Sequence, residues 1–430
     1  MNCIAATTEH VDIINCHAAF SMGLIGKEAS WALCVGDFEV HEPYFRAKPV
    51  IADKATEDRQ PKKRQKIERS VTEVETDKRH NEIRDLLLTG LEEVQLVWKN
   101  HDQTQTKVRE DKDLLDFTQL ASLVNATRRF SFQEIREPIF LEEDCTEMDT
   151  LSVFDTVVSN PSDYCRTLSL SKDHNYLIPS KSFFLMSDLD TSMDTLTDHA
   201  INIEGFDCIV MDPPWPNKSV HRSSHYETQD IYDFFKIPLP SLLSEEHPSL
   251  VAVWVTNRPK YRRFVIDKLF KAWGVTWVTD WYWLKLTTKG EPVMPLDSPH
   301  RKPYEQLIIG RRIPESTGEI PSNINIPPRI LASVPSNRHS RKPPLDSRFL
   351  FLNGKKKKKS DIYKLMVGIL APYLPNKPKC LELFARCLTP GWTSWGNECL
   401  KFQHQHYFTS TPNHNESSET EPSRLASDIK

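Results

Sequence analysis

The sequence predicts an α/β fold built around a mostly parallel sheet, together with an N-terminal accessory region of mixed α/β character. Residues 250–256 form an uninterrupted apolar run of strand length. A helix is expected over 257–274, because Pro259 suits an early helical position and Gly274 suits a C-terminal cap. Residues 275–285 are rich in tryptophan and are expected to form the next strand. Strand, helix and strand at these lengths are typical of a parallel sheet.

A further apolar strand is expected at 206–211, and it ends at Asp212, Pro213, Pro214 and Trp215. Two consecutive prolines cannot continue a sheet ladder, so the strand must end at Asp212. Ligands of open α/β sheets bind beyond the carboxyl ends of the strands. The Asp212 carboxylate is therefore expected at a binding site.

An exocyclic amine such as adenine N6 is a reaction partner that suits this tetrapeptide. The Asp212 carboxylate and the Pro213 carbonyl are expected to accept the N–H groups of the amine and to fix its position. Trp215 offers a flat face on which a base can stack. An isolated copy of such a tetrapeptide is more often a turn or a proline-rich ligand, so the assignment depends on further matches along the chain.

Composition limits the class of protein. The 430 residues predict two or three domains, and the net charge of −4 excludes a uniformly basic coat for nucleic acid. No apolar run approaches the roughly 18 residues that span a bilayer, so neither a membrane segment nor a signal peptide is expected. The nine cysteines include no C-x-x-C pair, which predicts reduced thiols and no metal site.

The first 182 residues carry no catalytic motif. Residues 1–50 are a candidate part of an accessory domain, and 51–80 are expected to be a basic, disordered linker, centred on 61–66. That basic cluster is a nuclear-import address, a nucleic-acid contact or only a solvated linker. Residues 81–182 form the accessory region, with a weaker helix expected at 112–125. The accessory region also contains one clear helix with an apolar stripe, which is expected to pack on its own domain. The stripe is formed by Ile83, Leu87, Leu91, Val94 and Trp98.

A basic segment follows the predicted sheet strands. Residues 329–359 contain ten Lys or Arg against one acid, which is the charge pattern that a polyanion requires. The stretch 346–359 ends in five lysines and is an atypical insertion, whether a genuine loop, an extra import signal or an artefact of the gene model. Residues 409–430 are expected to be a disordered tail.

The tetrapeptide at 212–215 resembles the signature of the N6-adenine methyltransferase family that includes the catalytic subunit of the mRNA adenosine methyltransferase. Further matches lie at 250–258, 302–305, 342–344, 381–386 and 391–398, and the last is most similar to the methyltransferase-like protein four branch. The resemblance covers about residues 183–408. It implies a Rossmann-like methyltransferase fold with a permuted motif order, because the tetrapeptide precedes the donor-binding segment, and it implies S-adenosylmethionine as the methyl donor.

The same resemblance implies the residues that hold the donor. Asp188 and Leu189 are candidates for its adenine, although an aspartate at a strand end also caps turns. Lys342 is expected to reach the donor's carboxylate or a nucleotide phosphate, and Arg386 to contact the donor beside Asp212. Glu382 stands near the end of one expected strand, and Asn397 and Glu398 stand at the end of the next, where methyl-donor folds place an acidic residue that takes the ribose hydroxyls. Cys387 stands where relatives commonly carry Asn or His, a departure that bears on donor affinity.

Candidate substrate residues lie in loops. The polar segment 216–228 is typical of a mobile loop at the mouth of a site, or of a merely solvated one. Within it, Tyr226 is a candidate for stacking on the target base, and His221 and Arg222 for meeting a phosphate. Lys302, Arg338 and Arg341 are further candidates for contacts with the substrate.

The expected function is S-adenosylmethionine-dependent methylation of adenine N6 in nucleic acid, with an unstacked or single-stranded target. The resemblance implies RNA, specifically an internal 2′-O-methyladenosine of U2 small nuclear RNA, with DNA as the second choice. The nucleus is the expected location, with the cytoplasm as a further one, and the chain is compatible with a monomer. The alternatives are a non-catalytic subunit that presents nucleic acid to a partner, and a nuclear scaffold.

Overall fold

The computed structural model describes residues 4–34, 36–44, 71–98, 137–170, 174–191, 193–216, 230–299, 301–315, 325–337, 341–345 and 369–412. The expected helix at 112–125, the basic cluster at 61–66 and the insertion at 346–359 lie outside these ranges. The candidate residues outside them are His221, Arg222, Tyr226 and Arg338.

Within the described residues the main sheet has twelve strands, and seven neighbours form its centre. In spatial order these are β9 (Phe183–Leu185), β16 (Thr393–Trp395), β15 (Cys380–Leu383), β10 (Cys208–Met211), β11 (Ser249–Val255), β13 (Tyr304–Arg312) and β12 (Thr276–Lys285). The first five run parallel, and β13 is antiparallel to both of its neighbours. The predicted Rossmann-like α/β fold is confirmed.

The order of strands in the sequence differs from their order in space. Among the strands of this sheet β15 and β16 come last in the sequence, yet β15 lies between β10 and β16. In the pairing of β10 with β15, Val210 is opposite Glu382 and Met211 is opposite Leu383. The segment that begins at Asp212 and the segment that follows Leu383 therefore leave the same carboxyl edge side by side.

Segments from the first 182 residues extend this sheet at both ends. β1 (Ile4–Thr7) pairs with β2 (Val11–Ile14), which runs parallel to β14 (Ile330–Ser333) next to β12. At the other edge β6 (Val157–Ser159) pairs with β9, and β4 (Ile139–Phe140) pairs with β6. Much of the predicted accessory region thus shares one sheet with the catalytic segment.

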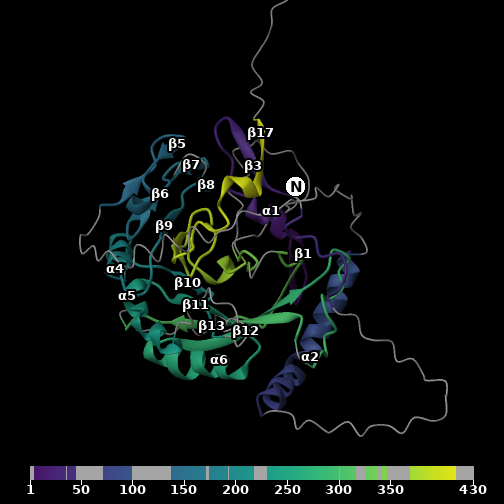
Figure 1. Ribbon diagram of the computed structural model, residues 1–430. Helices are drawn as coiled ribbons and strands as arrows, with labels where there is room; N and C mark the ends of the chain where they lie inside the picture. Colours follow the sequence, from purple (N-terminus) through teal and green to yellow (C-terminus); the bar gives the residue numbers. More distant parts are fainter. Residues whose placement is uncertain are drawn as a thin grey trace, which may run out of the picture.

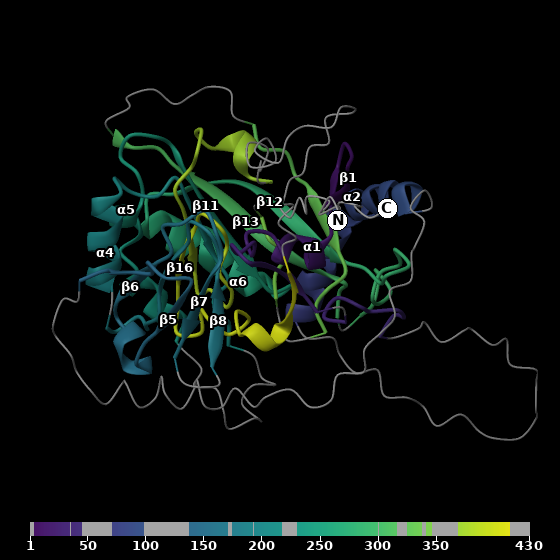
Figure 2. The same ribbon diagram turned by 90° about the horizontal axis from the view of Figure 1, so that it is seen from above.

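Four helices cover one face of the sheet. α4 (Met193–Asn202) and α5 (Leu239–Leu242) lie at one end and α2 (Val71–Trp98) at the other, as Figures 1 and 2 show. Between them α6 (Pro259–Phe264) continues into the π-helical turn η4 (Val265–Phe270). Alternate side chains of β10 and β11, such as Met211 and Val253, join α4, α5, α6 and η4 in one core, whereas α2 packs in a separate cluster.

The long helix α2 packs on the sheet as its apolar stripe predicts. Ile83, Leu87 and Val94 are buried against β2, β12 and β14, while Leu91 and Trp98 are half-buried. The helix already begins at Val71, so the predicted linker ends before residue 71 and not at residue 80.

The opposite face is covered by both termini of the described chain. α1 (Cys16–Phe20) and β3 (Ala29–Leu33) lie over the sheet, and β3 pairs with β17 (Phe408–Pro412) (Figure 1). Their apolar side chains meet the other set of alternating residues from β10, β11 and β12, including Trp254, Trp281 and Trp283. These tryptophans are core residues, as alternation along strands predicts.

A smaller sheet and four short 3-10 helices complete the described structure. The sheet contains β5 (Cys145–Glu147), β7 (Arg166–Ser169) and β8 (Asn175–Ile178). The short helices are η1 (Thr150–Val153), η3 (Ile231–Lys236), η7 (Ala371–Tyr373) and η8 (Gln405–Tyr407). Among the helices of the described ranges, none combines the length and apolar character that crossing a bilayer requires.

Candidate active site

Asp212 lies directly after β10, and the chain turns sharply there. The Asp212 N–H still donates to the Leu383 carbonyl of β15, at 3.4 Å, before the prolines end the ladder. The Pro213 carbonyl accepts the Trp215 N–H at 2.8 Å across Pro214, which is a three-residue turn. This bond occupies one lone pair of the Pro213 carbonyl, and the second is available for the predicted N–H of an amine.

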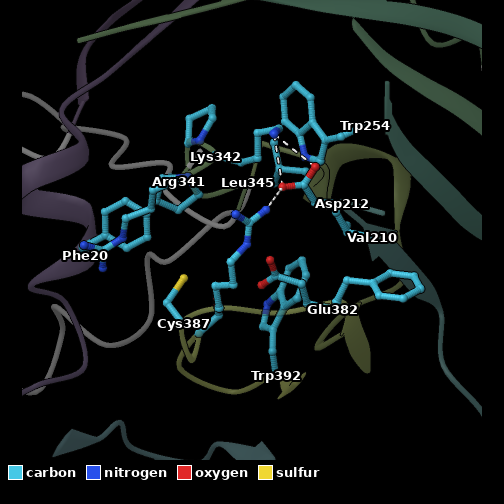
Figure 3. A pocket seen from close by; sticks show the side chains of 15 residues that line it. Phe20, Val210, Asp212, Trp254, Arg341, Lys342, Leu345, Glu382, Cys387 and Trp392 are labelled. Carbon is cyan, nitrogen blue, oxygen red and sulfur yellow. Dashed lines mark hydrogen bonds and ion pairs between the residues drawn. The ribbon is translucent and has the colours of Figure 1, made fainter. Parts of the chain in front are cut away.

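Two cations hold the Asp212 carboxylate. The Lys342 ammonium lies 3.0 Å from Oδ1 and 3.1 Å from Oδ2, and an Arg386 guanidinium nitrogen lies 2.6 Å from Oδ2 (Figure 3). The side chains of Asp212 and Lys342 are largely buried, at 12% and 11% exposure. The structure thus brings together three predicted residues, although Lys342 and Arg386 follow Asp212 by 130 and 174 positions in the sequence.

The cluster continues beyond Asp212 to a second carboxylate. Lys342 also lies 3.1 Å from Glu305 Oε2, and Lys285 donates to Glu305 Oε1. Burial disfavours the charged form of Glu305, but Lys342 and Lys285 outweigh that effect and lower its pKa to about 2. Burial likewise opposes the charge of Lys342, and Asp212 and Glu305 reverse this, so its pKa is raised.

A hollow opens beside this cluster at the carboxyl edge of the sheet. Its polar lining includes Asp212, Lys342, Arg386 and Glu382, and its apolar lining includes Trp254 and other rings. Figure 3 shows the carboxylates of Asp212 and Glu382 on one side and the thiol of Cys387 on the other. Burial raises the pKa of the Cys387 thiol to about 12, so it is an uncharged part of the wall.

The N-terminal segment forms part of the wall of this hollow. Phe20, at the end of α1, lines it, and the Arg341 guanidinium lies over the Phe20 ring at 3.7 Å from the centroid. Phe402 and Phe38 complete an aromatic enclosure around Arg341, and Asp37 Oδ2 lies 3.9 Å from it. Burial lowers the pKa of Arg341. Arg341 thus ties the first 44 residues to the backbone that carries Lys342.

The structure corrects the assignments of two basic candidates for substrate contact. The Arg341 side chain is 2% exposed in its aromatic enclosure, so it forms part of the wall and offers no surface to a polyanion. The Lys302 side chain is 4% exposed and lies under α2, where its ammonium is 3.5 Å from Asp77. Both were selected from charge and motif position, and neither property determines the direction of a side chain.

Trp215 also has a different role from the one its sequence position predicts. Its Nε1–H donates to the Trp254 carbonyl at 2.8 Å, and its ring packs against Tyr261, 4.7 Å away between centroids. The residue is 9% exposed within the core under α6. The expected stacking face is therefore covered, because the tight turn at Pro213 directs the indole inward.

The remaining donor candidates lie at the same edge but outside the lining of the hollow. Asp188 Oδ1 accepts the Asp190 N–H at 3.0 Å and the Thr191 hydroxyl at 3.1 Å, which is the turn-capping role left open by the sequence. Leu189 is buried in the core. Asn397 and Glu398 directly follow β16; Asn397 is exposed, and Glu398 pairs with Lys401 at 2.8 Å.

Comparison with known proteins identifies the family. The model of the MT-A70 family matches residues 206–398. The chain is 36% identical over 348 residues to the human N(6)-adenine-specific methyltransferase METTL4, an alignment that covers 76% of this chain and 67% of the relative. The chain belongs to the MT-A70 family. The predicted family and the predicted class of enzyme, a methyltransferase, are confirmed.

Two other similar proteins differ in the substrate that their names state. The chain is 35% identical over 241 residues to the N6-methyladenosine RNA methyltransferase MTA1 of Pyricularia oryzae, covering 53% of this chain and 55% of that protein. It is 32% identical over 237 residues to a DNA N6-methyl methyltransferase of Caenorhabditis elegans, covering 54% and 56%. Proteins similar to this chain are thus named for RNA in one case and for DNA in the other.

MT-A70 methyltransferases use S-adenosylmethionine, and the lining of the hollow suits that donor. Lys342 and Arg386 are cations for its carboxylate, Glu382 is an acceptor for hydroxyl or ammonium groups, and Trp254 and Phe384 offer apolar surface. Among the described residues, no cluster of three or more His, Cys, Asp or Glu side chains is arranged to hold a metal ion.

No role was predicted for two residues of this MT-A70 site, Glu305 and Phe20. Glu305 belongs to the matched segment 302–305, but its function as the second anion of the cluster follows only from the structure. One signal was available: a glutamate at the start of a buried strand requires a cationic partner. Phe20 carried no such signal, because nothing in an apolar segment shows which distant cavity it will line.

Proposed function

We propose that this chain methylates adenine N6 in RNA, with S-adenosylmethionine as the donor, and that an internal 2′-O-methyladenosine of U2 small nuclear RNA is its target. The observation that carries the proposal is the position of Asp212. Its carboxylate ends the central strand, faces the hollow and is held by Lys342 and Arg386. RNA is preferred over DNA because the resemblance to the methyltransferase-like protein four branch implies RNA, and because the relative named for RNA is 35% identical to the chain and the one named for DNA 32%.

The contacts of Asp212 define what it does in the reaction. A carboxylate has about four lone-pair sites, and the two cations occupy three contacts, so one further donor is accommodated. An N–H of the target amine is that donor, which fixes the nitrogen and disperses its developing positive charge. S-adenosylmethionine supplies an electrophilic methyl group when it is bound. The proton lost from nitrogen passes to solvent or to Asp212.

Methyl incorporation tests this proposal. The full-length protein is incubated with S-adenosylmethionine carrying a labelled methyl group, together with RNA or DNA single strands of the same sequence. Each strand contains one adenine, and a further RNA contains 2′-O-methyladenosine at that position. We expect N6-methyladenine in RNA, most rapidly in the 2′-O-methylated strand. Asp212→Ala is expected to lose at least about 100-fold in kcat, the magnitude typical of an electrostatic catalytic group.

A matched control variant separates the loss of the catalytic carboxylate from the general effect of removing one negative charge. Asp144 is a surface aspartate paired with Lys27, with both side chains more than half exposed, so Asp144→Ala is expected to retain full activity. Methylation that survives Asp212→Ala would contradict the proposal, and preferential methylation of the DNA strand would reassign the substrate.

We also propose that the protein acts in the nucleus. The support is the basic cluster at 61–66, together with a nuclear RNA target. Fluorescence microscopy of the tagged full-length chain tests this, with Lys62, Lys63 and Arg64 replaced by Ala in a second version. We expect nuclear signal that the triple substitution disperses, and cytoplasmic signal for the unchanged chain contradicts the proposal.

A further inference from the structure

An exposed pair of aromatic rings lies next to the catalytic turn. η3 (Ile231–Lys236) carries Tyr232 and Phe235, which are 63% and 41% exposed. Their rings are stacked, with centroids 6.2 Å apart and an interplanar angle of 18°. Exposed aromatic surface of this kind is costly in water, and paired rings of fixed orientation are typical of surfaces that stack nucleobases.

Contacts of the same short helix place this pair at the rim of the active site. Phe234, between the two exposed rings, is buried against Trp215 at 5.4 Å and against Phe384 at 5.6 Å. Phe384 lines the hollow, and Trp215 ends the catalytic tetrapeptide. The inner side of η3 therefore supports the site, while its outer side presents the rings to solvent.

The rings of Tyr232 and Phe235 are also supported from the core side by the ring of Phe264. Tyr232 and Phe235 both meet the Phe264 ring edge-on, at 5.7 and 5.9 Å, and Phe264 in turn meets Trp215 at 6.4 Å. Because Phe264 is 8% exposed within the core, the platform rests on a rigid base. A fixed ring loses little conformational entropy when a base stacks on it.

The charges around this surface suit a nucleic acid strand. Lys260 is exposed on α6, one helical turn before Phe264, so it projects from the same side as the platform. The nearby carboxylates of Asp190 and Asp233 are both paired with Lys236, at 2.8 and 3.0 Å. Lys236 and Lys260 together balance these two carboxylates, and Lys260, whose ammonium lies 4.7 Å from the centroid of the Tyr261 ring, is the cation placed to meet a phosphate.

We propose that Tyr232 and Phe235 form a stacking platform for a nucleotide that flanks the target adenine in a single strand. This rests on the proposed function, because only a nucleic acid substrate has flanking bases. When the target adenine leaves the base stack to enter the active site, the adjacent base in the strand loses a stacking partner. An exposed ring at the rim takes the place of that partner. The platform carries no hydrogen-bond readout, so it adds affinity for single strands with little sequence preference.

Steady-state methylation kinetics of the full-length protein test the proposal. With a single-stranded oligonucleotide as substrate, Tyr232→Ala and Phe235→Ala are each expected to raise KM about tenfold, with kcat within about twofold of the parent. Tyr232→Phe retains the ring and is expected to restore KM. With a substrate that lacks flanking nucleotides, all of these variants should match the parent.

Tyr164→Ala is the matched control. Tyr164 is also exposed, at 43%, but its carbonyl accepts the Asn160 amide at 2.8 Å, and Asn160 in turn bonds Ser182, which precedes β9 at the amino edge of the sheet. Its KM should not change. Unchanged KM in both alanine variants of the platform overturns the proposal.

A direct binding measurement separates this inference from the proposed function. An oligonucleotide carrying 2-aminopurine next to the target adenine is titrated with protein, and stacking on Tyr232 is expected to quench its fluorescence. If the parent protein methylates no oligonucleotide, the proposed function fails, whereas quenching that persists unchanged in Tyr232→Ala and Phe235→Ala refutes only the platform.

Discussion

The ammonium group of Lys342 lies within 3.1 Å of both carboxylate oxygens of Asp212. The same ammonium lies 3.1 Å from Glu305, so one cation joins two largely buried anions at the carboxyl edge of the sheet. Because removing one partner of such a cluster leaves the others uncompensated, each member should affect both ligand binding and stability.

Replacing Lys342 with Met should weaken binding of the methyl donor. The substitution retains the aliphatic stem but removes the cation that suits the donor's carboxylate. Hydrogen bonds to charged groups contribute about 1.5–3 kcal/mol, so we expect Kd to rise at least about tenfold. Isothermal titration with S-adenosylmethionine measures this.

A surface lysine provides the comparison for Lys342. Lys27 pairs with Asp144 at 3.1 Å with both side chains more than half exposed, so Lys27→Met should leave donor affinity unchanged. An unaltered Kd for Lys342→Met would show that Lys342 serves only to hold Asp212 and Glu305.

Glu305 should make the folded state sensitive to acid. Its pKa is lowered from 4.5 to about 2 in the folded chain, because Lys342 and Lys285 outweigh the effect of burial. A lowered pKa contributes stability that is present above pH 4.5 and is lost as the pH falls towards 2. The difference in stability between the parent and Glu305→Gln should therefore narrow over that range. Urea denaturation at pH 6, 4 and 3 measures it.

Glu142→Gln serves as the control for this titration, because Glu142 is exposed. Its unfolding midpoint should differ little from that of the parent at each pH. If the difference in free energy of unfolding between the parent and Glu305→Gln stays constant from pH 6 to pH 3, the assigned role of Glu305 is contradicted.

The sequence predicted the central sheet and the catalytic corner because both depend on local signals. The strand at 208–211, the prolines after it and the helix from Pro259 to Gly274 each follow from a pattern within a few residues. The meeting of Asp212 with Lys342 and Arg386 was predicted only through resemblance, since no local rule brings together residues so far apart.

The predictions that failed concern the direction of side chains. Trp215 was assigned to the substrate from its flat ring and Lys302 from its charge and motif position, but one packs under α6 and the other under α2. Arg341 was assigned from the density of basic residues, and the N-terminal segment encloses it. Each outcome depends on a distant element, so a single sequence cannot determine it.

Cysteine reactivity should distinguish the wall of the hollow from the surface. Burial raises the pKa of the Cys387 thiol to about 12, whereas Cys145 is exposed. The thiolate is the reactive form, so iodoacetamide at pH 8 should label Cys145 and leave Cys387 unlabelled in the folded protein. Peptide mass spectrometry measures both, and urea-unfolded protein should label at both positions. Rapid labelling of Cys387 before unfolding would show that the hollow opens to solvent.

Trp215 should act through the stability of the catalytic turn. Replacing it with Ala removes a buried indole and its bond to the Trp254 carbonyl, so we expect a loss of about 3–5 kcal/mol in the free energy of unfolding. Trp215→Phe keeps most of the packing against Tyr261 and should lose about 1–2 kcal/mol. Urea denaturation measures both. If Trp215→Ala instead unfolds like the parent while its KM for an oligonucleotide rises, the indole must turn outward and stack on the target base.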